Sequence, residues 1–222
     1  MVSTDPAGKV LAVALAALAG FVDAIGFLHL GGFFVSFMSG NSTRLAVGVT
    51  WRGSEAAVAG GLIAAFVMGV IVGSLAGHRA GDRRRRTVLT FVAGLLFAAG
   101  GLTRIGSVGS GIAVAVVAMG AMNAVFERDD DIPFGVTYVT GALVKAGQRL
   151  ALALRGGPRT EWLLFVLLWL GLVLGAVGGS AFYSVLGLDS LWLAAVMAAM
   201  LAVAPQVDAP AKRQGAKAGS IE

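Results

Sequence analysis

Asp23 has the clearest capacity for chemistry in this sequence. It is the only one of the twelve acidic residues that lies well inside an apolar segment. Placing a carboxylate there costs about 2.5 to 3.5 kcal/mol on insertion scales, so a compensating interaction is expected. We interpret Asp23 as a proton-titrating or substrate-orienting group, with Arg44 or Lys145 as its partner. The alternative is a hydrogen bond to Asn123 that serves only helix packing.

Two further apolar segments, 31–54 and 132–160, are interrupted by hydroxyl, amide and cationic side chains. Such groups can replace water around a polar solute, although Ser, Thr and Asn also cap frayed helix ends. Their cations favour an anionic solute, unless they extend to lipid headgroups. The candidate substrate-binding or coupling residues are Asp23, Ser36, Ser39, Asn41, Arg44, Asn123, Thr137, Tyr138, Thr140 and Lys145.

Other kinds of site lack their sequence signatures. Cysteine is absent, and His29 and His78 have no companions at metal-ligand spacing. The sequence contains no nucleotide-binding loop, nucleophile elbow, zinc signature or pair of carboxylates. We therefore expect neither an enzyme, nor a metal or cofactor site, nor direct use of ATP.

The composition is that of a membrane protein. Apolar residues make up 57% of the chain and charged residues 13%, with a mean hydropathy of +0.85, which a soluble domain of this size could not accommodate. Nucleic acid is not implied by the basic excess. About 20 apolar residues cross a bilayer as a helix, so we expect six spans, with cores at 10–30, 56–77, 87–103, 105–126, 162–188 and 190–207.

The loop charges predict the orientation of these spans. If both interrupted segments are re-entrant, 14 of the 17 Lys and Arg residues lie on the cytoplasmic side, in agreement with the positive-inside rule. An eight-span arrangement would place Lys9 and the basic tail outside. The apolar run continues past the small-residue stretch 16–20, so we expect a retained first helix rather than a cleaved signal peptide. Both termini are therefore predicted to lie in the cytoplasm, with the chain in the inner (plasma) membrane.

An internal repeat divides the chain. Gly20–Ala24 aligns with Gly120–Ala124 at an offset of 100, and Val35–Gly40 with Val136–Gly141 at an offset of 101. The glycines at 69 and 73 recur at 175 and 179, an offset of 106. We expect one membrane domain, 1–222, in which repeat 1 covers about 9–104, repeat 2 about 105–207, and 208–222 form a disordered cytoplasmic tail.

An odd number of spans in each half makes the predicted repeat inverted. The fold class is therefore an all-α membrane protein with a 3+3 inverted repeat, each half carrying a broken or re-entrant segment. We expect the breaks at Gly40–Asn41 and Gly141–Ala142, since Gly permits conformations that a helix excludes. In such repeats the broken helices commonly meet near the membrane midplane and line a solute site.

The remaining motifs have structural interpretations. The glycine ladders favour internal helix packing, with a homodimer seam as the alternative. The run Arg83–Arg86 is interpreted as a topogenic anchor with some contact to anionic lipid. Glu127–Asp131 is interpreted as a solvated cytoplasmic loop.

Two motifs carry a resemblance to a known family. Gly20–Phe27 followed by Phe33–Asn41 resembles the signature of the YoaK-type bacterial transmembrane family, and Thr137–Gly141 resembles its second block. The resemblance spans roughly 10–205 and implies a six-helix bacterial membrane protein of unknown function. Ser39 stands where the family leads us to expect Thr, and the hydroxyl is retained. The positions carried over as motif members are Asp23, Gly40, Asn41, Thr140 and Gly141.

The function predicted from these patterns is transport of a small polar solute by a secondary transporter or channel. Asp23 would be the coupling carboxylate, the two broken segments would form the site, and the charge of the solute stays open. The alternative is a non-transporting scaffold or a lipid-handling accessory protein. A polar cavity among Asp23, Ser39, Asn41, Thr140 and Lys145 would favour transport, whereas a filled interface would favour the scaffold.

Overall fold

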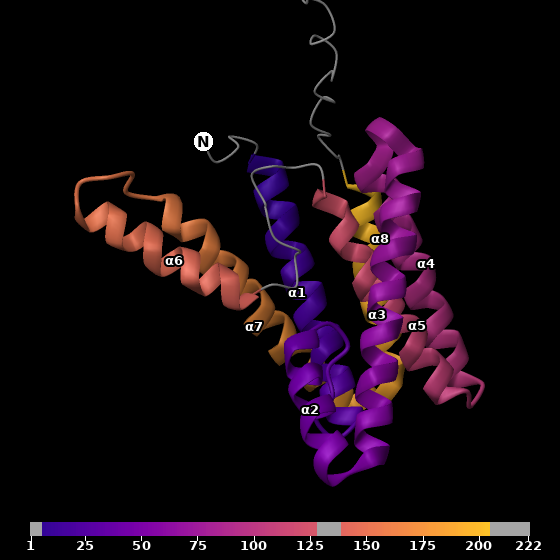
Figure 1. Cartoon of the computed structure of the whole chain (residues 1–222). Helices are drawn as coiled ribbons and strands as arrows, with labels where there is room; N and C mark the ends of the chain where they lie inside the picture. The colour runs from indigo at the N-terminus through magenta and orange to yellow at the C-terminus, as the bar shows by residue number, and fades with distance from the viewer. Residues whose placement is uncertain (1–5, 128–138, 205–222) are drawn as a thin grey trace, which may run out of the picture.

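The computed structural model describes residues 6–127 and 139–204, which are helical and contain no strand. The candidates Thr137 and Tyr138 and the predicted tail, 208–222, lie outside the described residues. In chain order the elements are α1 (Pro6–His29), α2 (Met38–Trp51), α3 (Gly53–Ala80), η1 (Gly81–Arg83), α4 (Arg84–Arg104), α5 (Val108–Met122), η2 (Asn123–Phe126), α6 (Val139–Leu154), α7 (Glu161–Leu186), η3 (Gly187–Asp189) and α8 (Ser190–Val203) (Figure 1).

Four continuous helical stretches among the described residues are long and apolar enough to cross a membrane. They are Pro6–His29, Gly53–Arg104, Val108–Phe126 and Glu161–Val203. A helix satisfies its backbone hydrogen bonds internally, which a lipid environment requires. The second and fourth stretches contain 52 and 43 residues, and each folds back at a 3-10 helix, so the four stretches comprise six helices. All six apolar runs predicted from hydropathy are therefore confirmed as helices.

The two fold-back turns have the same backbone conformation. Gly81, after α3, has a φ of 56°, and Gly187, after α7, has a φ of 55°. This left-handed region is disfavoured for residues with a Cβ, so Gly is suited to both positions. Each turn reverses the chain. Helix α4 then returns in contact with α3, whereas α8 packs mainly against α4.

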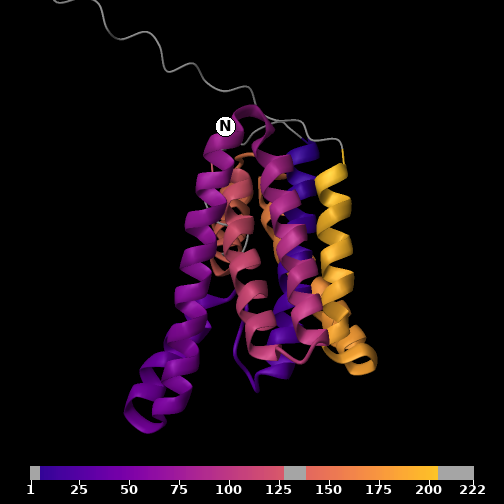
Figure 2. The same ribbon diagram turned by 90° about the vertical axis from the view of Figure 1, so that its right-hand side faces the viewer.

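Helices α1 and α5 form the centre of the molecule. In α1, 67% of the apolar window is buried inside the protein, and in the α5–η2 stretch 61% is buried. The corresponding windows of the α3–α4 and α7–α8 stretches are only 22% and 17% buried. Most residues of α3 and α7 face outward, whereas α4 and α8 each bury one face. Figure 2 shows α3, α5, α4 and α8 side by side, and each of these neighbours is in contact.

Glycines bring α7 against the backbone of α1. A Cβ placed on Gly175 would lie 1.9 Å from the carbonyl oxygen of Ala17, and one placed on Gly20 would lie 2.1 Å from that of Leu172. Both distances are far below van der Waals contact, so the helix backbones touch directly at these points. Close approach through small residues is the usual means of helix association in membranes.

The same contact occurs between α3 and α5. A Cβ on Gly69 would lie 2.1 Å from the oxygen of Val117, and one on Gly120 would lie 2.1 Å from that of Phe66. Each α3 residue precedes its α7 counterpart by 106 positions, and each α5 residue follows its α1 counterpart by 100. These are the offsets of the sequence repeat. The expectation that the glycine ladders pack internally agrees with this arrangement.

The expected break points are wrong. Gly40–Asn41 and Gly141–Ala142 lie in the first turns of α2 and α6, not between helices. In the first half the chain leaves α1 earlier, at Gly31 and Gly32, where φ is 65° and 99°. The irregular part of segment 31–54 therefore precedes α2, which has only 14 residues, and α6 has 16. Neither short helix is among the stretches that can cross a membrane.

Replacing Gly175 with Ala should lower the stability of the bundle. The added methyl group would force α7 away from the Ala17 carbonyl, and overpacking of about 1 to 3 kcal/mol corresponds to a melting temperature lower by roughly 3 to 10 °C. Gly61→Ala is the matched control, because a Cβ at Gly61 of α3 meets no atom within 4 Å. Thermal unfolding of both variants in detergent measures the effect. Equal melting temperatures would show that the close contact is not stabilising.

Candidate functional site

The carboxylate of Asp23 binds the loop that follows α1. Its Oδ1 accepts hydrogen bonds from the backbone N–H of Val35 at 2.8 Å and of Ser36 at 2.6 Å. Its Oδ2 accepts a hydrogen bond from the Ser36 hydroxyl at 2.6 Å. Asp23 is 8% exposed and Ser36 is 3% exposed. Buried N–H groups need acceptors, and after α1 ends no helical carbonyl is available to those of Val35 and Ser36. The Asp23 carboxylate supplies the acceptor oxygen instead.

Asn41 completes this arrangement from the first turn of α2. Its side-chain oxygen accepts a hydrogen bond from the Phe34 N–H at 3.0 Å, and its side-chain nitrogen donates to the Phe34 carbonyl at 2.7 Å. Asn41 is fully buried. Together Asp23, Phe34, Val35, Ser36 and Asn41 form a group that we call the Asp23 cluster, which fixes the loop between α1 and α2.

Two glycines make room for the Asp23 cluster. A Cβ on Gly26 would lie 2.2 Å from the Cγ2 atom of Val35, and one on Gly40 would lie 2.7 Å from the Phe37 ring. The Phe34 ring lies between those of Phe27 and Phe37, with centroids 5.1 and 5.2 Å away, in a tilted and an edge-to-face arrangement. The motif residues at 20–27 and 33–41 therefore meet in one packed unit.

The partners of Asp23 are not those predicted. The donors to its carboxylate come from Val35 and Ser36, and not from Arg44, Lys145 or Asn123. No simple sequence rule could have found them, because two of the three donors are backbone groups. Only the third donor, the Ser36 hydroxyl, belongs to a residue that the sequence marked as a candidate.

Arg44 lies on the other side of this loop. Its guanidinium is 4.5 Å from the ring centroid of Phe33, 3.4 Å from the Gly31 carbonyl oxygen and 4.0 Å from a carboxylate oxygen of Glu55. These contacts tie α2 to the loop and to α3. Ser39 is exposed on α2.

The described candidates of the second half, Asn123, Thr140 and Lys145, lie away from the Asp23 cluster. Asn123 donates to the carbonyls of Met119 and Gly120 in its own helix. Thr140 is exposed in the first turn of α6, and the Lys145 amine lies 5.8 Å from the Phe165 ring centroid. Helices α2 and α6 lie toward opposite ends of the molecule and do not contact one another (Figure 1). Among the described candidates, the structure thus brings Asp23, Ser36 and Asn41 together, and it does not bring them to Asn123, Thr140 or Lys145.

A second polar group joins α3, α4 and η2. Arg84 donates from Nε to the Ala124 carbonyl at 2.7 Å and forms an ion pair with Glu127. The Ser74 hydroxyl donates to the same carboxylate at 2.6 Å. Arg85 lies over the Phe126 ring, 5.1 Å from its centroid. The interpretation of Arg83–Arg86 as a topogenic anchor in contact with anionic lipid did not include this ion pair. Arg84 and Arg85 share the helix face of the buried Val88, Leu89 and Val92.

Comparisons with known proteins agree with the membrane assignment. A family model described as "Protein of unknown function (DUF1275)" matches residues 11–204. A UPF0700 transmembrane protein of Rhizobium meliloti (strain 1021) is 36% identical over 198 residues, which cover 89% of this chain and 85% of that protein. No solved structure matches. The predicted resemblance to an uncharacterised family of transmembrane proteins is confirmed.

Replacing Asp23 with Ala should release the loop from α1. Three donors would lose their acceptor, and each buried unsatisfied group costs about 1 to 3 kcal/mol. Hydrogen exchange measured by mass spectrometry should therefore become faster in peptides that cover 33–37. Asp23→Asn keeps an acceptor oxygen and should have a smaller effect. Asp82→Ala, at an exposed acid in η1, is the control, and equal exchange in all variants would contradict the anchoring role.

Proposed function

We propose that this chain, which belongs to the DUF1275 family of proteins of unknown function, moves a small polar solute across a bacterial membrane as a secondary transporter or channel. The observation that carries this proposal is the helix contact made twice, by α7 on α1 and by α3 on α5. It supports two halves related by an inverted repeat. Inverted repeats are the usual architecture of secondary transporters.

The repeated contact supplies a physical basis for alternating access. In Figure 1 equivalent helices of the two halves run in opposite directions, and α2 and α6 lie toward opposite ends. If each half can adopt the conformation of the other, a state open at one end has a counterpart of similar energy open at the other end. A solute then only needs to shift populations between these states.

Asp23 is the proposed point of proton coupling. As a carboxylate it accepts hydrogen bonds from two backbone N–H groups and a hydroxyl. Protonation adds an O–H donor and weakens both oxygens as acceptors, so the hold on the 33–37 loop would loosen. The loop and α2 would act as a gate at their end of the protein.

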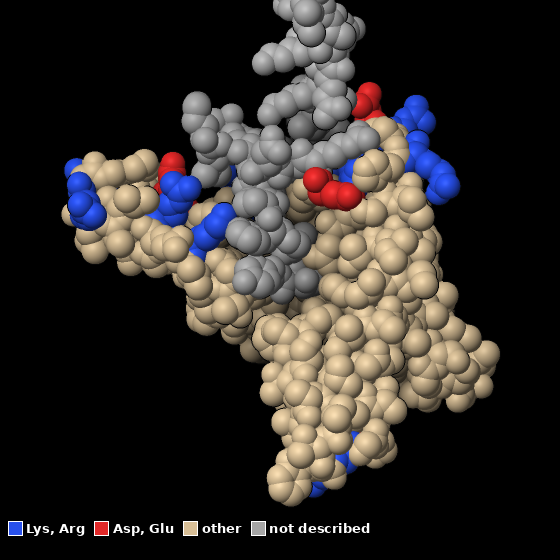
Figure 3. Space-filling view, in the orientation of Figure 1, with Lys and Arg blue, Asp and Glu red and all other residues tan. Residues whose placement is uncertain are grey.

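The charge distribution supports the proposed orientation. Figure 3 shows Lys and Arg gathered at the end of the molecule that holds α6 and the α3–α4 turn, with few at the α2 end. By the positive-inside rule the α6 end faces the cytoplasm. Helix α1 starts at this same end (Figure 1), which agrees with a cytoplasmic N-terminus.

A non-transporting scaffold is the second candidate, and one observation favours it. The polar atoms of Asp23 and Asn41 are buried and bonded to the loop, so the Asp23 cluster is a filled interface rather than an open cavity. A filled interface of this kind is sufficient for a scaffold, which requires no solute pathway. Transport instead requires a second state in which the cluster opens.

Single cysteines should react on opposite sides of the membrane at two repeat-related positions. The chain has no Cys, so Ser54→Cys and Thr160→Cys can be made without background. Both residues are exposed, at the starts of α3 and α7. A membrane-impermeant maleimide should label Ser54→Cys in spheroplasts and Thr160→Cys only in inverted vesicles. Labelling of both from one side would contradict the inverted arrangement.

Reconstituted protein should accelerate solute entry into vesicles. Light scattering after mixing with iso-osmotic glycerol, glycine or sodium acetate should show faster swelling than protein-free vesicles for at least one solute. With proton coupling, Asp23→Asn should remove the pH dependence of this rate, whereas Asp82→Asn should keep it. Swelling at the protein-free rate for a wide solute panel would leave the scaffold as the better account.

A further inference from the structure

The run of four arginines at the start of α4 is divided between the inside and the outside of the protein. Arg84 and Arg85 are buried, 4% and 6% exposed, and contact η2. Arg83 and Arg86 are exposed, and within the described part of the chain neither has an ion-pair partner. This outward pair, Arg83 at the end of η1 and Arg86 in the first turn of α4, presents two guanidinium groups at the start of α4.

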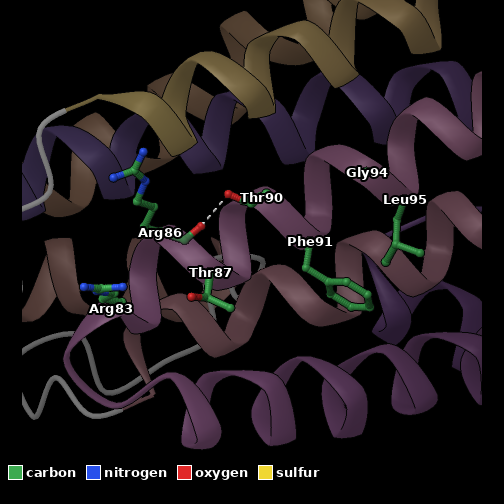
Figure 4. A pocket seen from close by; sticks show the side chains of 7 residues that line it. All are labelled: Arg83, Arg86, Thr87, Thr90, Phe91, Gly94 and Leu95. Carbon is green, nitrogen blue, oxygen red and sulfur yellow. Dashed lines mark hydrogen bonds between the residues drawn. The ribbon is translucent and has the colours of Figure 1, made fainter.

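A surface hollow begins at this outward pair. It has a volume of about 820 Å³ and runs along one face of α4 (Figure 4). We call it the α4 hollow, and its lining consists of Arg83, Arg86, Thr87, Thr90, Phe91, Gly94 and Leu95.

The lining of the α4 hollow changes from charged to apolar along the helix. The arginines come first, then the hydroxyls of Thr87 and Thr90, and then an apolar floor. From Arg86 to Gly94 is eight residues, a rise of about 12 Å. The Cβ position of Gly94 has no atom within 4 Å, so the floor is open at this point. This order, from cation through hydroxyl to apolar surface, matches the order of groups in a phospholipid.

We propose that the α4 hollow binds an anionic phospholipid. Its phosphodiester oxygens would accept hydrogen bonds from Arg83 and Arg86, since guanidinium groups match phosphate geometry. The glycerol region would lie beside Thr87, and an acyl chain would lie over Phe91 and Gly94. The proposal is independent of transport, because it uses none of the residues of the Asp23 cluster.

Charge complementarity selects a lipid over other occupants. A second copy of this chain docked symmetrically on α4 would place the unpaired arginines of both copies near each other, and such like-charge contacts are unfavourable. Free phosphate would use the arginines but leave the apolar floor uncovered. A phospholipid would place its phosphate at the arginines and its acyl chain over the apolar floor.

Native mass spectrometry of the full chain with dioleoylphosphatidylglycerol tests the proposal. Arg83→Gln combined with Arg86→Gln should weaken lipid binding by about tenfold or more, since each basic residue near anionic lipid contributes on the order of 1 kcal/mol. The control combines Arg79→Gln with Arg155→Gln, two exposed arginines outside the α4 hollow. It removes the same charge and should bind lipid like the wild type.

The apolar half of the site has its own test. Gly94→Leu should weaken lipid binding without a change of charge, whereas Gly101→Leu, further along α4 and also in open space, should not. Thermal unfolding in detergent confirms that each variant is folded. Equal lipid binding by both double variants, unchanged binding in Gly94→Leu, or complete displacement by millimolar inorganic phosphate would overturn the proposal. A wild-type dimer that separates in the Arg83/Arg86 variant would overturn it as well.

Discussion

A backbone N–H group buried away from water must find an acceptor, and in the described part of the chain the break between α1 and α2 shows how this requirement is met. Once the helix ends at His29, the N–H groups of Val35 and Ser36 have no carbonyl partner in a helix. Asp23 reaches them from within α1, and Asn41 holds Phe34 from α2. The position of α2 depends on this bonding, and so does its approach to α3.

The arrangement of the larger helices rests on direct backbone contact. Glycines on α7 touch α1, and glycines on α3 touch α5. Helices α7 and α3 thus pack on the two central helices, α1 and α5, and these contacts join segments far apart in the sequence. Lipid tails are as apolar as the side chains, so burying apolar side chains between helices gains little free energy in a membrane. Close packing is then a main source of helix association.

The arginine run shows how helix geometry separates identical residues. A turn of 3.6 residues directs Arg84 and Arg85 toward η2 and the Glu127 carboxylate, while Arg83 and Arg86 face outward. A buried guanidinium requires a partner, and Glu127 together with the Ala124 carbonyl provides one. A run interpreted as a topogenic anchor thus also contributes to packing, through Arg84 and Arg85.

The sequence by itself determined the membrane class, the six apolar helices and the offsets of the repeat, because these depend on local composition and spacing. The importance of Asp23 was also evident, since a lone carboxylate in an apolar helix needs compensation. Only the tertiary structure decided what Asp23 binds, that the chain breaks at Gly31 and Gly32 rather than Gly40, and that Arg84 is buried. These features arise where backbone groups and distant helices meet, and no pattern of side-chain types along one segment specifies such contacts.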